Sequence, residues 1–320
     1  FARDPSLNLL LGALATDEHT DDIEPGEPRP RGATRLVEDE PGARRPNIVI
    51  FVMESTRADA LTVYTPDLAS TPFLAEMAKE SVVVERVYSQ VPHTSKALTS
   101  ILCGYEPRLT LEVVEAREGG LPGPCLPSLL AKQMGYRTAF FQSATGKYED
   151  RAGLVKNMGY QHFEHGDQWD HAGFEKANYF GYEDAIMLDP AKRWLDANVG
   201  RGAPLLITYL TLTPHHDYLA PKRRYGRVRL AKGDKMNRYL NTVRYLDFLF
   251  KDIVDQFKEL GLYENTVFLA LGDHGEAFGE HKLWLHDDVM YDEGLRVPFM
   301  LHAPGLAAER IEGPASIVDT

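Results

Sequence analysis

Three long apolar segments most constrain the fold of this 320-residue chain. They are Asn47–Met53, Leu205–Leu212 and Thr266–Leu271, and each continues directly into polar residues. Uninterrupted apolar runs of this length predict strands buried on both faces, as in a parallel sheet covered by helices. Polar side chains that follow such strands gather at one edge of the sheet, where ligands bind in this class of fold.

The segments between these strands carry a regular alternation of helix and strand patterns. Apolar residues recur at helical spacing in Thr71–Glu80, Leu126–Met134, Glu183–Asn198 and Lys235–Leu260. Further strands are expected at Val82–Tyr88, Arg137–Gln142 and Val297–His302. The alternation predicts an α/β fold of the three-layer α/β/α kind, with a largely parallel, mixed central sheet.

Residues 1–45 differ from the rest of the chain. From Asp17 to Arg45 the sequence is charged, rich in proline and glycine, and without helical or strand periodicity. Such a composition predicts a linker rather than a packed domain. We therefore expect one globular domain over residues 46–320.

Acidic and histidine side chains directly follow two of the apolar strands. Glu54 comes after the first strand, and Asp273 with His274 after the last. A carboxylate oxygen and an imidazole nitrogen together suit a divalent cation such as zinc or manganese. Glu54 could instead cap a helix or form an ion pair, and His274 could be a hydrogen-bonded core residue. Their shared position at strand ends favours the metal site.

Hydroxyl side chains begin a predicted helix after Pro92. Thr94 and Ser95 stand near its N-terminus, where free backbone N–H groups favour phosphate or another oxyanion. Thr94 can both cap the helix and act as a nucleophile, with Ser95 as the alternative nucleophile. Lys96 either adds positive charge for a substrate or is solvated.

Histidines complete the polar set. His215 and His216 follow the middle strand, and His286 stands downstream of the Asp-His pair. The spacing after Pro214 favours His215 as the substrate-facing member of its pair, with His216 as the alternative. His281 is either a ligand or supporting residue, or a surface residue.

The order of these motifs resembles that of one superfamily. Four motifs follow one another as in the sulfatase-like branch of the alkaline phosphatase superfamily: Glu54-Ser55-Thr56, His93-Thr94-Ser95, Thr213-Pro214-His215-His216 and Gly272-Asp273-His274-Gly275-Glu276. The similarity is greatest to membrane-anchored phosphoethanolamine transferases and to lipoteichoic acid synthase-like phosphoglycerol transferases. It runs from about Pro46 to Pro304, nearly all of the predicted domain.

The resemblance implies a role for each motif residue. Glu54, Asp273 and His274 would be metal ligands, and Thr94 would be the nucleophile and fourth ligand. His215 and His286 would hold phosphoryl oxygens. One divalent ion is implied, zinc or manganese, with magnesium and calcium fitting less well. The implied fold is the alkaline-phosphatase-like α/β/α sandwich.

Two features depart from true sulfatases. Their nucleophile stands in Cys-x-Pro-Ser-Arg or Ser-x-Pro-Ser-Arg, and neither pentapeptide occurs here. They usually place two aspartates after the first strand, where this chain has Glu54-Ser55. A calcium site and sulfate ester hydrolysis are therefore the weaker expectations.

The resemblance and the residue types together predict a metal-dependent phosphotransferase. It would cleave a phosphodiester of the lipid-headgroup type through phospho-Thr94 and pass the group to an alcohol on a lipid or glycan. The alternatives are a phosphodiesterase or phosphonate monoester hydrolase, a sulfuric ester hydrolase, and a non-catalytic sensor that binds a headgroup or glycan. The intact nucleophile and ligand set argue against the sensor.

The resemblance also predicts the surroundings of the domain. It implies a bacterial inner-membrane protein with an upstream anchor, its catalytic domain periplasmic or extracellular, and a C-terminus cut short at residue 320. Phospholipid or glycan substrates and a monomeric state are expected. The net charge of −12 argues against nucleic-acid binding, which needs a basic surface.

Two cysteines flank a loop rich in glycine and proline. Cys103 and Cys125 would be free thiols in the cytosol. Because the resemblance places the domain outside the cytosol, we predict a disulfide between them. Closing a loop of about 23 residues would stabilise the fold by roughly 3 kcal/mol.

Overall fold

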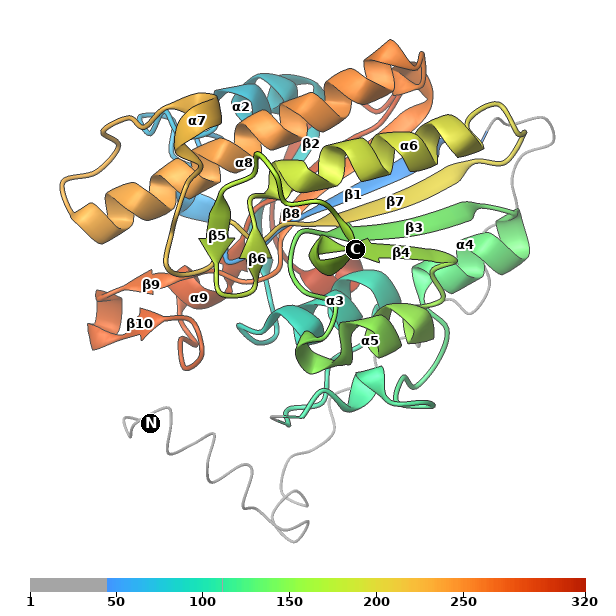
Figure 1. The fold of residues 1–320 in the computed structure, drawn as a ribbon. Coiled ribbons are helices and arrows are strands. Elements are labelled where there is room, and N and C mark those ends of the chain that lie inside the picture. Colours follow the sequence, from blue (N-terminus) through green and yellow to red (C-terminus); the bar gives the residue numbers. More distant parts are fainter. Residues whose placement is uncertain (1–44, 111) are drawn as a thin grey trace, which may run out of the picture.

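The computed structural model describes residues 45–110 and 112–320, so the predicted linker lies outside the described residues except for Arg45. Its centre is a mixed, mostly parallel sheet (Figure 1). In spatial order its strands are β11 (Arg296–Val297), β2 (Val82–Tyr88), β12 (Phe299–His302), β8 (Thr266–Gly272), β1 (Asn47–Met53), β7 (Leu205–Leu210), β3 (Arg137–Gln142) and β4 (His162–His165). A further strand, β13 (Glu309–Ser316), pairs with β2.

The three apolar runs form the middle of this sheet. β1 lies between β8 and β7 and is parallel to both, with Met53 opposite Gly272 and Val52 opposite Leu210. Most side chains of these strands are fully buried on both faces, as an uninterrupted apolar run predicts. The residues that follow β1, β7 and β8 therefore emerge together at one edge of the sheet.

Helices cover both faces of the sheet (Figure 1). One layer contains α2 (Pro72–Met77), α6 (Leu188–Asn198) and α8 (Asp234–Glu259), and the other contains α3 (Thr94–Cys103), α4 (Leu126–Met134) and α5 (Arg151–Met158). Successive β1 residues point to opposite layers: Phe51 packs on Phe250 of α8 at 4.9 Å between ring centroids, whereas Val52 joins the core beneath α3. This confirms the predicted three-layer α/β/α fold.

Smaller elements lie outside the layers. They are the hairpins β5 (Lys176–Asn178) with β6 (Gly181–Tyr182) and β9 (Ala277–Phe278) with β10 (Trp284–Leu285), and the short helices α7 (Lys222–Tyr225) and α9 (Asp292–Leu295). Figure 1 shows both hairpins toward the left of the sheet.

Three predicted elements are divided in the structure. The strand expected over 297–302 is interrupted at Pro298, because proline has no N–H to donate to a neighbouring strand. The helix expected over 71–80 becomes α2 and a 3₁₀ turn over Ala78–Glu80. The helix expected over 183–198 begins as a 3₁₀ turn over Asp184–Met187 and continues as α6.

Asp247 links two helices of one layer. Its carboxylate accepts hydrogen bonds from the N–H groups of Phe73 (2.9 Å) and Leu74 (2.8 Å) at the start of α2. Asp247→Ala would leave both N–H groups without an acceptor in a buried place. We expect it to lower the free energy of unfolding by about 1–3 kcal/mol, measured by urea denaturation.

The matched control for Asp247 is Asp255→Ala on the same helix. Asp255 is partly exposed and pairs with Lys251 at the helix surface, so its loss should change stability by less than about 1 kcal/mol. Equal effects of the two substitutions would contradict the capping role of Asp247.

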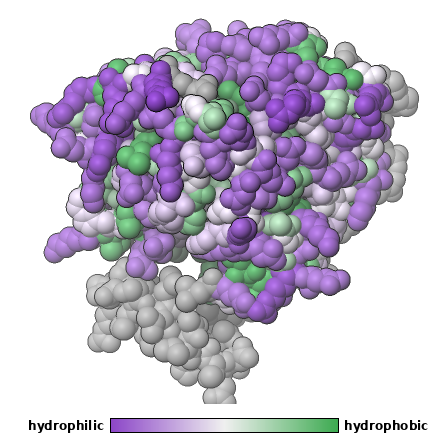
Figure 2. Space-filling view, in the orientation of Figure 1, coloured by the Kyte–Doolittle hydropathy of each residue, from purple (hydrophilic) through white to green (hydrophobic). Residues whose placement is uncertain are grey.

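The surface facing the viewer in Figure 2 is mostly hydrophilic, with scattered hydrophobic side chains. Among the described residues, no helix combines the length and the apolar character needed to cross a bilayer.

Candidate active site

Three of the predicted metal ligands converge at the edge of the sheet. Because β1 and β8 are paired in register, Glu54 and Asp273 leave neighbouring strands side by side, and His274 follows at once. One ligand atom from each of the three lies within 4.8 Å of the others. All three side chains are buried, which is the setting of a bound cation rather than of a surface acidic patch.

Asp273 has one oxygen that is satisfied and one that is not. Oδ1 accepts hydrogen bonds from the N–H groups of Ser55 (2.9 Å) and His274 (2.7 Å). Oδ2 is buried and has no hydrogen-bond partner among the described residues. Burial, together with the neighbouring Glu54 carboxylate, raises the pKa of Asp273 well above its ordinary value. A divalent cation would bind Oδ2 and offset the repulsion, so these residues fit the metal.

His274 presents one ring nitrogen to the cluster. Its Nδ1–H donates to the carbonyl of Gly275 (2.9 Å), which leaves the Nε2 lone pair free. Nε2 lies 3.5 Å from both Glu54 Oε1 and Thr94 Oγ1. Burial lowers the pKa of His274 to about 3, so the imidazole is neutral and can act as a ligand.

Thr94 is the hydroxyl that faces this cluster. It is the first residue of α3, and its Oγ1 donates to Glu54 Oε2 at 3.0 Å. The Ser95 hydroxyl instead donates to Glu149 Oε2 at 2.6 Å. Of the two predicted nucleophiles, the geometry therefore favours Thr94.

Two further histidines border the cluster. The ring of His286 lies 4.6 Å from that of His274 and 5.2 Å from that of His215. The loop carrying His215 is held by the buried Asp184, which accepts from the N–H groups of Leu212 (2.6 Å) and Thr213 (3.0 Å). The two predicted substrate-binding histidines, His215 and His286, therefore lie next to each other, and His286 also contacts His274 of the ligand cluster.

Glu276 orients His286. The Glu276 carboxylate accepts from the hydroxyl of Tyr218 (2.5 Å) and lies 2.6 Å from His286 Nδ1. Burial opposes the charged form of His286, but Glu276 outweighs it and raises the pKa of His286. Nε2 of His286 lies 3.6 Å from Oδ1 of the exposed Asp287. The sequence analysis included Glu276 in a motif but predicted no function for its side chain.

His216 takes a position different from that of His215. Its Nε2 lies 3.0 Å from the hydroxyl of Tyr179. His216, Glu276 and His286 also place one potential ligand atom each within 4.8 Å of one another. This second group is the one that a two-metal site would use.

The prediction that Lys96 binds substrate or is solvated is corrected by the structure. Lys96 is only 3% exposed, and its Nζ donates to Glu115 Oε2 at 2.8 Å and to the carbonyl of Glu112 at 2.9 Å. A buried ammonium needs a carboxylate partner, and the loop after α3 supplies one. Lys96 therefore anchors this loop.

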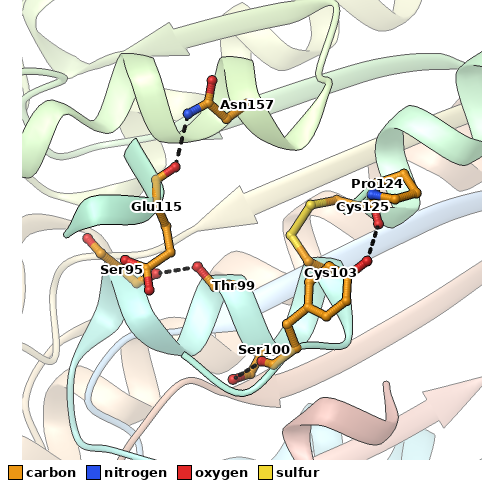
Figure 3. The surroundings of a disulfide bond; sticks show 9 residues. Ser95, Thr99, Ser100, Cys103, Glu115, Pro124, Cys125 and Asn157 are labelled. Carbon is orange, nitrogen blue, oxygen red and sulfur yellow. Dashed lines mark hydrogen bonds between the residues drawn. A yellow bond between two sulfur atoms is a disulfide. The ribbon is translucent and has the colours of Figure 1, made fainter. Parts of the chain in front are cut away.

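The same loop contains the predicted disulfide. Cys103 and Cys125 are joined with an S–S distance of 2.07 Å, at the C-terminal end of α3 (Figure 3). Asn157 of α5 donates to the carbonyl of Glu115 at 2.9 Å. The loop is therefore attached to α3 at both of its ends and to α5, which stabilises the helix that begins with Thr94.

Arg151 is a site residue that the sequence reasoning missed. It begins α5, is buried, and interacts electrostatically with Glu149, Glu54 and Asp273. Its Nη1 is buried without a hydrogen-bond partner among the described residues. An unpaired guanidinium nitrogen beside the cluster suits an anionic oxygen. Arg151 follows no strand and stands in no motif, so no sequence signal marked it.

His281 and His93 lie outside the cluster. His281 pairs with Glu293 (2.8 Å) and stacks on Tyr291, with half of its side chain exposed. His93 Nε2 lies 2.9 Å from Glu149. These contacts place His281 at the surface and His93 in a supporting position.

His286→Ala is expected to lower phosphodiester turnover about 10²–10³-fold while the bound metal remains. The reason is that His286 borders the cluster without supplying one of its three ligand atoms. Steady-state rates and elemental analysis measure the two effects, with His281→Ala as the control that should keep both. Metal loss from a folded His286→Ala protein would make His286 a ligand and favour a two-metal hydrolase.

Comparisons with known proteins concern the family of this chain. Residues 46–320 match the family model described as Sulfatase. The lipoteichoic acid synthase-like YvgJ of Bacillus subtilis is 25% identical over 284 residues, which are 84% of this chain and 45% of that protein. An ulvan-active sulfatase of Formosa agariphila is 23% identical over 305 residues, which are 86% of this chain and 60% of that protein. The chain thus spans less than two thirds of the length of these relatives.

Solved structures show the same fold. The lipoteichoic acid synthase LtaP from Listeria monocytogenes has a TM-score of 0.72 at 19% identity, covering 85% of this chain and 69% of that one. The C-terminal periplasmic domain of EcEptC from Escherichia coli, in complex with Zn, has a TM-score of 0.65 at 20% identity, covering 88% and 82%. These likenesses confirm the predicted alkaline-phosphatase-like fold.

Proposed function

Because this chain belongs to the sulfatase family, we propose that it is a metal-dependent phosphotransferase that cleaves a phosphodiester through phospho-Thr94. The observation that carries the proposal is the position of the Thr94 hydroxyl, 3.0 Å from Glu54 and 3.5 Å from His274. A threonine hydroxyl is a weak nucleophile at neutral pH and needs an adjacent metal ion or base to react.

Glu54, Asp273 and His274, with Thr94 as fourth ligand, would hold one zinc or manganese ion. When bound, the ion favours the alkoxide of Thr94 and polarises a phosphoryl oxygen. The neutral imidazole of His274 and the free Oδ2 of Asp273 support this ligand set.

The chain's own residues then account for each step. Thr94 Oγ forms a bond to phosphorus as the bond from phosphorus to the leaving alcohol breaks, and His286 or His215 supplies the proton to that alcohol. Arg151 would hold a non-bridging oxygen through its unpaired Nη1. An acceptor hydroxyl then gives its proton to that histidine and attacks phosphorus, the Thr94 Oγ1–P bond breaks, and both Thr94 and the histidine are restored.

Transfer to an alcohol, rather than to water, requires space for an acceptor. A cavity of about 330 Å³ is lined in part by Thr145, Lys176, Tyr179 and Phe180. The rings of Tyr179 and Phe180 also contact His215, at 5.9 and 5.2 Å between centroids. The cavity thus adjoins the site and has polar side chains suited to a polyol or sugar. Hydrolysis of phosphodiesters, phosphonate monoesters or sulfate esters is the alternative.

We also propose that the enzyme works at the bacterial cell envelope on a phospholipid or glycan, as a monomeric domain of a membrane-anchored protein. The names of the lipoteichoic acid synthase relatives support a substrate of this kind. The disulfide supports an oxidising compartment.

Mass spectrometry of the trapped intermediate tests the proposal. The zinc- or manganese-loaded protein is incubated with a phosphodiester and quenched in acid. We expect a peptide with Thr94 modified by the phosphoryl group and its retained substituent. Turnover without any adduct on Thr94, under conditions where the reaction is stopped midway, would contradict it.

A further inference from the structure

One segment of the chain is strongly basic, although the chain as a whole is acidic. Over residues 222–235, which run from α7 into the first turn of α8, the sequence has seven lysine or arginine residues and a single acidic residue, Asp234. The exposed basic side chains of this segment are Lys222, Arg223, Arg227, Arg229, Lys232 and Lys235.

Within the part of the chain that the structure describes, none of these six side chains forms an ion pair with a carboxylate. Arg229 Nη2 donates instead to the carbonyl of Lys232 at 2.7 Å. Glu175 is the carboxylate at α7, but it accepts from the backbone N–H groups of Lys222 (2.9 Å) and Arg223 (3.0 Å). Other lysines on the helices do have acidic partners, in the pairs Lys192–Asp196 and Lys251–Asp255. The six positive charges are therefore available to an anionic partner.

Two asparagines of α8 hold this segment in a fixed conformation. Asn241 Oδ1 accepts from the N–H of Val228, and its Nδ2 donates to the Val228 carbonyl, both at 2.9 Å. Asn237 Oδ1 accepts from the N–H groups of Leu230 (2.7 Å) and Ala231 (3.1 Å). The side chains of Leu230 and Ala231 pack on the core beneath α8. Because these groups face the helix, the basic side chains between them project outward.

Two apolar side chains are exposed among the basic ones. Val228, between Arg227 and Arg229, is 39% exposed, and Trp284 of β10 is 54% exposed. Lys235 Nζ lies 4.8 Å from the centroid of the Trp284 ring, so the β9–β10 hairpin belongs to the same surface. We call this surface, made of the six basic residues with Val228 and Trp284, the basic face.

The basic face lies beside the active site. Trp284 stands two residues before His286 and is paired with Phe278 across the hairpin. Phe278 packs on Tyr218, with 5.3 Å between ring centroids, and the Tyr218 hydroxyl donates to Glu276 of the site. In Figure 1, α7, the start of α8 and the β9–β10 hairpin lie toward the left, at one end of the molecule. A flat partner that meets the basic face therefore also meets the end of the molecule that carries the site.

We propose that the basic face is a docking surface for a lipid bilayer that contains anionic phospholipids. Anionic headgroups attract lysine and arginine side chains, and tryptophan favours the boundary between headgroups and acyl chains. The net charge of −12 does not oppose this contact, because charges farther from the bilayer than the screening length of about 8 Å at physiological ionic strength contribute little.

A dissolved polyanion is the competing partner. It would match the six positive charges but would offer no apolar phase to Val228 and Trp284, whereas a bilayer satisfies both parts of the surface. The observations therefore favour the bilayer. This inference depends on the surface alone and requires neither the nucleophile nor the metal.

Flotation of the metal-loaded protein with vesicles tests the proposal. Vesicles of phosphatidylcholine are compared with vesicles of phosphatidylcholine and phosphatidylserine. We expect binding at least about tenfold stronger to the anionic vesicles, and progressively weaker as sodium chloride is added. Equal binding to the two kinds of vesicle, or binding to neither, would overturn the proposal.

Paired substitutions locate the contact. The double variant Arg229→Gln, Lys232→Gln should bind the anionic vesicles at least about tenfold more weakly than the wild type. The matched control, Lys192→Gln with Lys251→Gln, removes the same charge from lysines that already pair with carboxylates, and it should bind as the wild type does. Circular dichroism checks the fold of both. An equal loss in the two variants would assign binding to overall charge and overturn the basic face.

Fluorescence quenching distinguishes a bilayer from a dissolved polyanion. Trp284 is exposed, whereas the two other tryptophans, Trp169 and Trp194, pack on the core. Anionic vesicles whose acyl chains carry bromine should quench the wild-type protein, and the quenching should disappear in Trp284→Leu. Binding without quenching would reveal a purely electrostatic contact, as with a polyanion, and would overturn the bilayer proposal.

Thr94→Ala separates this inference from the proposed function. Thr94 lies outside the basic face, so the variant should bind the anionic vesicles as tightly as the wild type does. Absence of phosphodiester turnover in the wild type would reject the proposed function and leave vesicle binding intact. Absence of vesicle binding in an active wild-type protein would reject only the docking surface.

Discussion

Thr94→Ala is expected to reduce turnover of bis(p-nitrophenyl) phosphate by on the order of 10³-fold or more, because it removes the attacking oxygen. The bound metal should largely remain, since Glu54, Asp273 and His274 still supply three ligand atoms. Initial rates and elemental analysis of the same preparations give the two quantities. This pairing of lost rate with retained metal distinguishes a nucleophile from a structural ligand.

Ser95→Ala is the matched control for Thr94. Its hydroxyl bonds to Glu149 rather than to the ligand cluster, so its removal should leave most of the turnover. Thr94→Ser should retain part of the activity because a hydroxyl remains. If Thr94→Ala stayed active while Ser95→Ala lost turnover, the nucleophile would be Ser95.

Asp273→Asn is expected to lower bound zinc or manganese at least about tenfold and to abolish turnover with it. The asparagine oxygen can keep the hydrogen bonds from Ser55 and His274, so the fold should persist. Elemental analysis after dialysis measures the metal, and circular dichroism checks the fold. Asp273→Ala should give the same metal loss.

The thermal midpoint of the metal-free protein adds a second readout for Asp273→Asn. Burial and the adjacent Glu54 raise the pKa of Asp273, so the ionised carboxylate destabilises the metal-free fold. The variant should therefore unfold at an equal or higher temperature than the metal-free wild type. The exposed Asp292→Ala serves as control and should keep its metal. Wild-type metal content in folded Asp273→Asn would exclude Asp273 as a ligand.

The sequence by itself determined the layers and the strand-end residues. Strands β1, β7 and β8 are buried on both faces, and a strand in that position must be apolar throughout, so the pattern is visible without coordinates. Glu54, Asp273 and His274 were found for the same reason, because each directly follows such a strand. The helix over 126–134 was also correct at both ends, since Pro127 stands in its first turn and Gly135 directly follows its last residue.

Only the tertiary structure decided which polar side chains face one another. Lys96 pairs with Glu115 rather than with a substrate, and Arg151 reaches the cluster from a helix that no motif marks. His286 depends on Glu276, and Thr94 rather than Ser95 meets Glu54. Such pairings join residues far apart in the chain, and their choice depends on burial and on the direction of each side chain. Periodicity in the sequence shows which face of a helix or strand is apolar. The role of a polar side chain, in contrast, depends on the partners that folding brings within hydrogen-bonding distance.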